Sequence, residues 1–150
     1  MYSSKIPSRL IVDASILFSF FKSDSVRRQL IEELLNKGCK LISPSFVIEE
    51  LSNNNEGILK YSKIDSPTLL FLLCILQKSI ETFSEDIYES FLKQANKLFP
   101  HGEDTKDDPY FALSLALNKT PIWSDEKAFK KQLEIEIFST ADLLSLFEIK

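Results

Sequence analysis

Short apolar runs alternate with amphipathic stretches along almost the whole chain. The runs have the length and bounding turn residues of buried strands, and we predict strands at residues 9–13, 40–43, 79–83, 121–124 and 134–139. The intervening segments predict helices at residues 26–36, 45–51, 68–78, 85–98, 108–118, 126–132 and 140–147. Strands that alternate with helices favour an α/β fold, a three-layer sandwich in which helices flank a central parallel sheet.

Capping and turn residues set several of these boundaries. Asp24 or Ser25 is placed to cap the helix at 26–36, and Gly38 lies just past its end, as a C-terminal glycine should. Residues 52–57 carry the strongest loop signal in the chain. The helix at 68–78 is apolar almost all round, so we expect it to be buried.

Length and composition are those of one globular domain spanning residues 1–150. The longest apolar run, residues 69–76, is far shorter than the ~20 residues that cross a bilayer. The N-terminus lacks an apolar signal core, so we expect a cytoplasmic protein without a membrane segment. Cys39 and Cys74 both lie among apolar residues, and we predict two buried free thiols.

The net charge of −4 gives no general attraction for nucleic acid. This charge counts only weakly against a nucleic-acid substrate, because any acids that bind cations would be neutralised. Basic residues gather at residues 27–28 and among residues 127–131, which we interpret as solvated faces.

Acidic residues recur where the predicted strands end. Asp13 closes the apolar run at 10–12, and Glu50 lies in the helix after the second strand. Asp107 opens the helical segment at 107–113, and Asp125 with Glu126 follows the strand at 121–124. In an open parallel sheet, ligands bind outside the carboxyl ends of the strands. Converging carboxylates there indicate a site for Mg²⁺ or Mn²⁺, which suits phosphodiester hydrolysis.

Most of these acids also have a structural explanation. Asp13 can cap the helix that follows it, and the helix dipole alone favours the two acids after residue 124. Asp108 precedes a proline and is a natural helix cap, which leaves Asp107 without a structural role. Glu49 and Glu50 point about 100° apart on a helix, and periodicity does not choose between them.

Other chemistries fit the residues less well. His101 is the only histidine and lies in a Pro-His-Gly loop, which excludes a two-histidine ribonuclease mechanism and a histidine-rich zinc site. A phosphoacceptor receiver domain would need two acids at the first strand and one aspartate ending a middle strand. Asp13 stands alone, and the strand at 79–83 ends without an aspartate.

Four segments together resemble the motifs of PIN-domain nucleases, in the same order and over nearly the whole chain. The segment Leu10-Ile11-Val12-Asp13-Ala14-Ser15-Ile16-Leu17 is similar to their opening motif, and Ser43-Pro44-Ser45-Phe46-Val47-Ile48-Glu49-Glu50-Leu51 to the second. The third is Asp104-Thr105-Lys106-Asp107-Asp108-Pro109-Tyr110-Phe111-Ala112-Leu113, and the fourth is Ile122-Trp123-Ser124-Asp125-Glu126-Lys127-Ala128-Phe129.

The resemblance implies a PIN-like endoribonuclease that uses Mg²⁺ or Mn²⁺ and leaves a 5′-phosphate and a 3′-hydroxyl. It selects Glu50 over Glu49 and Asp107 over Asp108 as metal-binding acids, with Asp13 as the third. Many members are dimeric toxins that pair with an antitoxin protein, so RNA, an antitoxin and a second copy are the expected partners.

Two departures from the family pattern leave an alternative open. Ser15 stands where the family often has asparagine, although serine can still donate a hydrogen bond. The usual fourth aspartate aligns with Glu126, while Asp125 stands one residue earlier, so either acid is a candidate ligand. The alternative is a non-catalytic PIN-like module that binds RNA or protein.

Overall fold

The computed structural model describes residues 5–99 and 105–148. Within them, five strands form one all-parallel sheet in the order β3-β2-β1-β4-β5. The strands are β1 (Arg9–Val12), β2 (Lys40–Pro44), β3 (Ile80–Phe83), β4 (Ile122–Trp123) and β5 (Ile137–Phe138). All five predicted strands are therefore present, and the α/β fold class is confirmed.

Helices connect every pair of consecutive strands except the short link between β4 and β5, which holds a 3₁₀ turn. They are α1 (Ala14–Phe18), α2 (Val26–Asn36), α3 (Ser45–Asn53), α4 (Asn55–Ser62), α5 (Ser66–Ser79), α6 (Glu85–Tyr88), α7 (Leu92–Leu98), α8 (Asp108–Ala116) and α9 (Thr140–Glu148). The described residues also form three 3₁₀ helices: η1 (Ser19–Phe21), η2 (Glu89–Phe91) and η3 (Lys127–Lys131).

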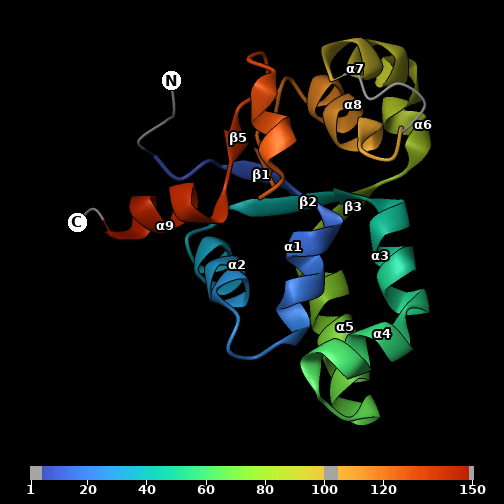
Figure 1. The fold of residues 1–150 in the computed structure, drawn as a ribbon, viewed down its shortest axis with the longest axis vertical. Coiled ribbons are helices and arrows are strands. Elements are labelled where there is room, and N and C mark those ends of the chain that lie inside the picture. Colours follow the sequence, from blue (N-terminus) through green and yellow to red (C-terminus); the bar gives the residue numbers. More distant parts are fainter. Residues whose placement is uncertain (1–4, 100–104, 149–150) are drawn as a thin grey trace.

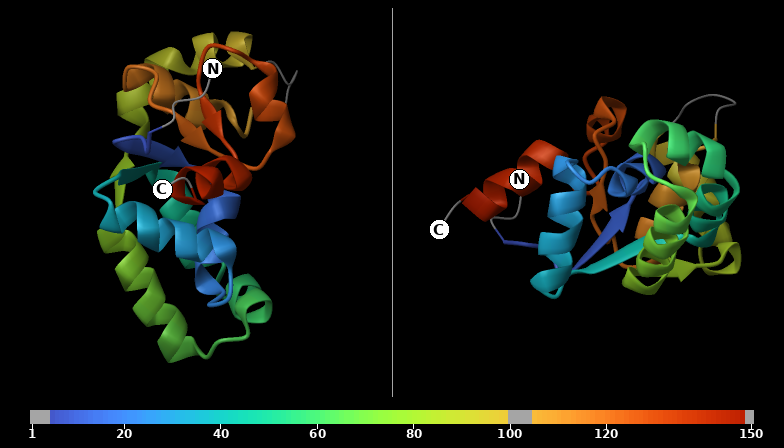
Figure 2. Two further views of the ribbon diagram at one scale, coloured as in Figure 1. Left: turned by 90° about the vertical axis from the view of Figure 1, so that its left-hand side faces the viewer. Right: turned by 90° about the horizontal axis from the view of Figure 1, so that it is seen from below.

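The sheet lies between two groups of helices. Helices α1, α2 and α5 lie below it in Figure 1, and α6, α7 and α8 lie above. In the side view of Figure 2, α5 extends away from the sheet, with α4 near its far end. A parallel sheet covered on both faces buries continuous apolar strands, which explains why β1 and β4 lack the alternation of a half-exposed strand.

The chain reverses its direction of travel across the sheet at β1. It moves outward through β2 to β3 and then returns to the other side of β1 to form β4 and β5. The backbone joins the two halves there, because the amide of Asp13 donates to the carbonyl of Trp123 at 3.3 Å. Such a switch point leaves a crevice at the carboxyl ends of the strands, which is where α/β proteins bind ligands.

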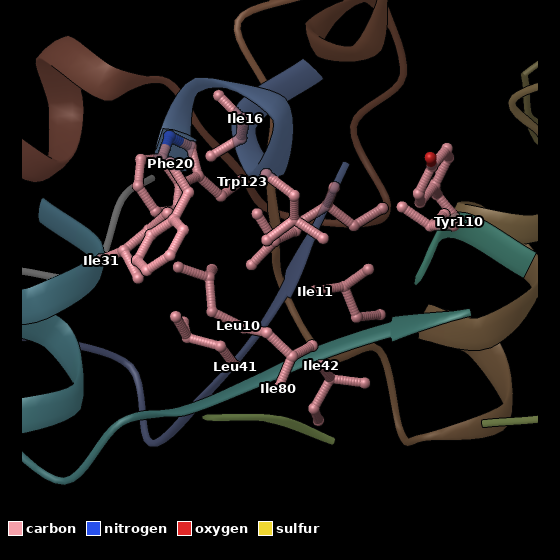
Figure 3. Close-up of a cluster of buried hydrophobic side chains, with 14 of the residues drawn as sticks. Leu10, Ile11, Ile16, Phe20, Ile31, Leu41, Ile42, Ile80, Tyr110 and Trp123 are labelled. Carbon is pink, nitrogen blue, oxygen red and sulfur yellow. The ribbon is translucent and has the colours of Figure 1, made fainter. Parts of the chain in front are cut away.

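The core is continuous from the lower helices through the sheet to the upper ones. Figure 3 shows Leu10 and Ile11 of β1 among residues of β2, β3 and α2, with Tyr110 of α8 at one margin. Trp123 is fully buried, and its indole nitrogen donates to the hydroxyl of Thr140 at 3.2 Å. The strand ends at this margin are therefore held by well-packed neighbours, which positions the residues that follow them.

The end of α2 forms as the sequence predicts. Ser25 caps its start by accepting from the amide of Arg28, and Gly38 follows its end with a φ of +83°. The amides of Gly38 and Cys39 bond back to carbonyls in the last turn of the helix. Glycine suits this position because a left-handed φ is unfavourable for residues with a Cβ.

Three expectations about burial and loops are wrong. Residues 52–57 do not form a loop, because α3 runs to Asn53 and α4 begins at Asn55. Helix α5 is buried on one side only, and its other side exposes Leu70 and Phe71 with 59% and 65% of their surface accessible. Cys39 is buried as expected, whereas Cys74 is exposed on that outer side of α5. The Pro-His-Gly loop with His101 lies outside the described residues.

Candidate active site

A pocket of about 330 Å³ opens at the switch point, where four segments of the chain meet. They are the start of α1 after β1, the middle of α3, the start of α8, and the turn between β4 and η3. Four carboxylates line the pocket: Asp13, Glu50, Asp107 and Glu126. Its other lining residues are Ala14, Ser15, Phe46, Lys106, Tyr110 and Phe129.

Asp13 both caps α1 and lines the pocket. Its Oδ1 accepts from the amide of Ile16 at 3.1 Å and from the hydroxyl of Ser15 at 2.8 Å. Both of these donors, within the described residues, reach Oδ1, so Oδ2 is the oxygen left for a ligand. The capping and functional explanations are therefore compatible. Ser15 supplies the hydrogen bond expected of a residue in its position.

Helix α3 carries Glu50 to the pocket wall. Val47, Ile48 and Leu51 anchor the helix by their burial, and Glu50 is exposed beside them. Glu50 lines the pocket, while its neighbour Glu49 is exposed and is not among the lining residues. Helical rotation of about 100° between adjacent residues explains the separation.

The two aspartates at the start of α8 have different surroundings. Asp107 is the residue before the helix and lines the pocket, but its side chain makes no capping hydrogen bond. Asp108 is 4% exposed, and its Oδ2 accepts from the side-chain amide of Asn96 at 3.1 Å. The side chain of Asp108 therefore lies in the contact between α7 and α8. Of the two aspartates, only Asp107 lines the pocket.

The acids after β4 are also divided between two environments. Glu126 is exposed and lines the pocket. Asp125 instead binds the start of α9: its Oδ1 accepts from the Thr140 amide and its Oδ2 from the Thr140 hydroxyl, both at 2.6 Å. Asp125 therefore lies outside the group of carboxylates that the pocket brings together.

Arg27 of α2 completes the surroundings of Asp125. Its Nε and Nη2 donate to Asp125 Oδ2 at 3.0 and 2.7 Å, and its Nη1 donates to the hydroxyl of Ser19 at 2.9 Å. Burial alone would raise the pKa of Asp125, but the hydrogen bonds from Thr140 and Arg27 outweigh it and lower that pKa. The interpretation of Arg27 as part of a solvated basic face is wrong.

Tyr110 joins two walls of the pocket. It is 4% exposed, and its hydroxyl accepts from the amide of Ala14 at 3.1 Å, which ties α8 to the start of α1. Burial raises the pKa of this hydroxyl, and the nearby charges of Asp13, Asp107 and Glu50 raise it further. Tyr110 is therefore a neutral group that three of the four carboxylates surround.

Sequence reasoning gave no role to Tyr110 or Lys106, although both lie in the third motif segment. Tyr110 follows Asp107 by three residues, so the spacing of the first helical turn places it on the same side of α8 as the preceding Asp107. That spacing was a usable signal. Lys106 adds a cationic side chain to the pocket lining, and only its position next to Asp107 could have indicated it.

The donor set suits a hard divalent cation, because carboxylate oxygens are the ligands that Mg²⁺ and Mn²⁺ prefer. Across residues 5–99 and 105–148, however, no group of three or more His, Cys, Asp or Glu side chains is gathered closely enough to hold an ion. Two of the four carboxylates, Glu50 and Glu126, are exposed and end flexible side chains. Rotation of these two toward Asp13 and Asp107 is what a shared ion would require.

The fold and the pocket define an α/β protein with an acidic site at the switch point of a parallel sheet. A family model described as the PIN domain matches residues 11–139, and the chain belongs to the PIN-domain family. PIN domains are generally nucleases, and the family generally uses divalent metal ions. A comparison with curated proteins gave no match. In the described parts of the chain, every helix is too short or too polar to cross a bilayer.

Proposed function

We propose that this protein is a divalent-metal-dependent endoribonuclease that hydrolyses phosphodiester bonds of RNA. The observation that carries the proposal is the meeting of Asp13, Glu50, Asp107 and Glu126 in one pocket at the switch point. The four come from segments up to 113 residues apart (126 − 13) in a chain that belongs to a nuclease family. Mutual repulsion of the carboxylates makes such a group costly unless a cation is part of its function.

The residues divide into ligands and supports. Asp13, Glu50 and Asp107 are the proposed ligands of the principal ion, and Glu126 is the proposed fourth acid. Bound there, Mg²⁺ or Mn²⁺ supplies an activated water and stabilises charge on the scissile phosphate.

The supports act through the protein itself. Ser15 holds Asp13 in one orientation through its hydrogen bond to Oδ1. Tyr110 keeps α8 against α1, which fixes the separation between Asp107 and Asp13. A site assembled in this way needs little rearrangement of its backbone when a phosphate arrives.

A cleavage assay with labelled RNA and Mn²⁺ tests the proposal. We expect the wild-type protein to cut, and Asp13→Asn, Asp107→Asn and Glu50→Gln each to lose most of that activity. Glu49→Gln is the matched control, because it removes a neighbouring charge outside the pocket lining and should cut like the wild type. Equal traces of cleavage in all the variants would show a contaminating nuclease and count against the proposal.

The second candidate is a non-catalytic PIN-like module that binds RNA or protein. The spread of the carboxylates favours it, as does the glutamate at position 126 in place of the family's aspartate. Metal-independent RNA binding without cleavage in any divalent cation would support this candidate over the enzyme.

A narrower proposal is that the protein acts as the toxin of a toxin–antitoxin pair. It rests on chain length and family, and an antitoxin and a homodimer stay predictions. Induced expression in a bacterial host tests it: wild-type protein should arrest growth, and Asp13→Asn should not. Normal growth with active, folded protein would contradict the toxin role while leaving the ribonuclease proposal intact.

A further inference from the structure

A second, smaller hollow adjoins the acidic pocket between α1 and α3. We call it the side groove. Its volume is about 210 Å³, and it is lined by Ala14, Ser15, Phe18, Val47, Glu50, Leu51 and Asn54. Ala14, Ser15 and Glu50 also line the acidic pocket, so the two hollows share a wall.

The lining of the side groove combines an aromatic surface with one amide. The ring of Phe18 packs against Tyr61 with centroids 4.7 Å apart, which holds Phe18 in place. The ammonium of Lys22 lies 5.6 Å from the centre of the Tyr61 ring and adds positive charge beside these rings. Aromatic faces with nearby cations are the usual contacts of single-stranded nucleic acids.

Asn54 provides a polar group at the groove, and the absence of a side chain at Gly57 leaves space for its amide. Its side chain lies over Gly57 at the start of α4, where an added Cβ would come within 2.5 Å of Asn54 Oδ1 and 2.9 Å of Nδ2. A residue larger than glycine at position 57 would therefore push the amide away. Asparagine amides can read the hydrogen-bonding edge of a base.

We propose that the side groove holds one base of a single-stranded RNA, stacked on Phe18 and contacted at its edge by Asn54. This inference rests on the proposed ribonuclease function, since it places the base next to the phosphate in the acidic pocket. The shared wall supports this placement of base and phosphate, because an RNA strand that crosses Asp13 and Glu50 passes the mouth of the side groove. Size also supports it: one turn of a partner's α-helix occupies roughly 400 Å³, about twice the groove.

Fluorescence of 2-aminopurine, a base whose emission falls on stacking, tests the inference without any cleavage. Short single-stranded RNAs carry the probe at each position in turn and are titrated with protein at low ionic strength in Ca²⁺, which can neutralise the acidic pocket, and gel electrophoresis verifies that the probe stays intact. We expect one position to be quenched by the wild-type protein. Phe18→Leu keeps an apolar side chain but removes the stacking surface, so the quench should be lost and binding weakened about tenfold.

Two further variants address the amide. Asn54→Ala and Gly57→Ala should weaken binding of the same probe by similar factors, because both remove the amide from the groove. They keep the test decisive if Phe18→Leu fails to fold, since Asn54 is exposed and circular dichroism reports folding in each case. Leu133→Ala, at a residue 95% exposed and outside both hollows, is the control and should bind like the wild type.

The outcomes separate this inference from the proposed function. Quenching that depends on Phe18, Asn54 and Gly57 supports the base site even if no RNA is cut in Mn²⁺. Cleavage by a protein whose probe binding ignores all three variants overturns the base site and leaves the nuclease intact. Absence of quenching in the wild type also overturns it.

Discussion

Asp125 and Glu126 are neighbours in the sequence, but their side chains lie in different environments in the fold. The sequence left open which of them serves the metal site, because both follow β4 and both begin a turn. Only the structure shows Arg27 and Thr140 around Asp125. Arg27 is 98 residues away, and no local pattern indicates its partner.

The charge on Asp125 should make stability depend on pH. Its folded pKa lies below the ordinary aspartate value of 3.8, so the contribution is complete above about pH 5 and is lost as pH falls through the folded pKa. We expect Asp125→Asn to lower the free energy of unfolding by roughly 1–2 kcal/mol at pH 7. Urea denaturation at neutral and acid pH measures this, and the deficit should vanish at the acid end.

Glu126→Gln is the matched control for that experiment. Glu126 is exposed, and its side chain is not part of the Arg27 contact, so its loss should change stability by less than about 0.5 kcal/mol. A similar loss in both variants would contradict the structural role assigned to Asp125.

The two cysteines should differ sharply in reactivity. Burial raises the pKa of the Cys39 thiol to about 11, whereas Cys74 is exposed on α5. Because the thiolate is the reactive form, one thiol per folded chain should react with Ellman's reagent at pH 8 and the second only after denaturation. Cys74→Ser should abolish the fast reaction. Two fast thiols in the folded wild type would contradict the burial of Cys39.

At the scale of elements, helix ends were predicted best where a cap or a glycine marks them, as at Ser25 and Gly38. At residues 52–57, by contrast, the local sequence predicted the wrong structure. Its asparagines and glycine are typical of a loop, yet they form the end of α3 and the start of α4 around a single residue, Asn54. Burial of Leu51 and Ile58 anchors the two helices there, and packing of this kind overrides weak local preference.

Helix α5 was predicted to be buried all round because it carries apolar residues on every side. Composition reports how apolar a helix is but not how many neighbours it will have. In the fold α5 extends away from the sheet edge, so only one side has neighbours (Figure 2). Leu72 is 5% exposed, while Phe71 beside it is 65% exposed.

Adjacent alanine substitutions test this orientation. Leu72→Ala should lower the free energy of unfolding by roughly 2–5 kcal/mol, because it leaves a cavity in the core. Phe71→Ala removes a larger side chain from solvent contact and should change stability by less than about 0.5 kcal/mol. Chemical denaturation measures both, and equal losses would show that a further surface covers the outer side of α5.

At the scale of the whole molecule, one rule predicted half of the carboxylates in the candidate site. Parallel strands end at the same edge, so the acids after β1 and β4 had to approach one another. Asp107 and Glu50 follow no strand directly, and the family resemblance selected them. The strand order, which makes β1 the switch point, depends on long-range pairing that apolar runs of similar composition do not specify.

Binding of a metal ion to the assembled pocket should stabilise the whole fold. An ion that binds only the folded protein adds about 2.7 kcal/mol at a concentration 100 times its Kd, which raises the Tm of a domain of this size by roughly 5–10 °C. We expect Mn²⁺ to produce such a rise in the wild type and little or none in Asp13→Asn or Asp107→Asn. Differential scanning fluorimetry measures it without reference to catalysis.

Asp125→Asn provides the comparison that makes the metal titration specific. Its Tm without metal should be lower than that of the wild type, yet Mn²⁺ should raise it by the same increment, because Asp125 lies outside the pocket lining. Glu126→Gln should show the reverse pattern, with a normal starting Tm and a smaller increment. If Asp125→Asn lost the increment and Glu126→Gln kept it, the fourth ligand would be Asp125, and the contact with Arg27 would have to open when the ion binds.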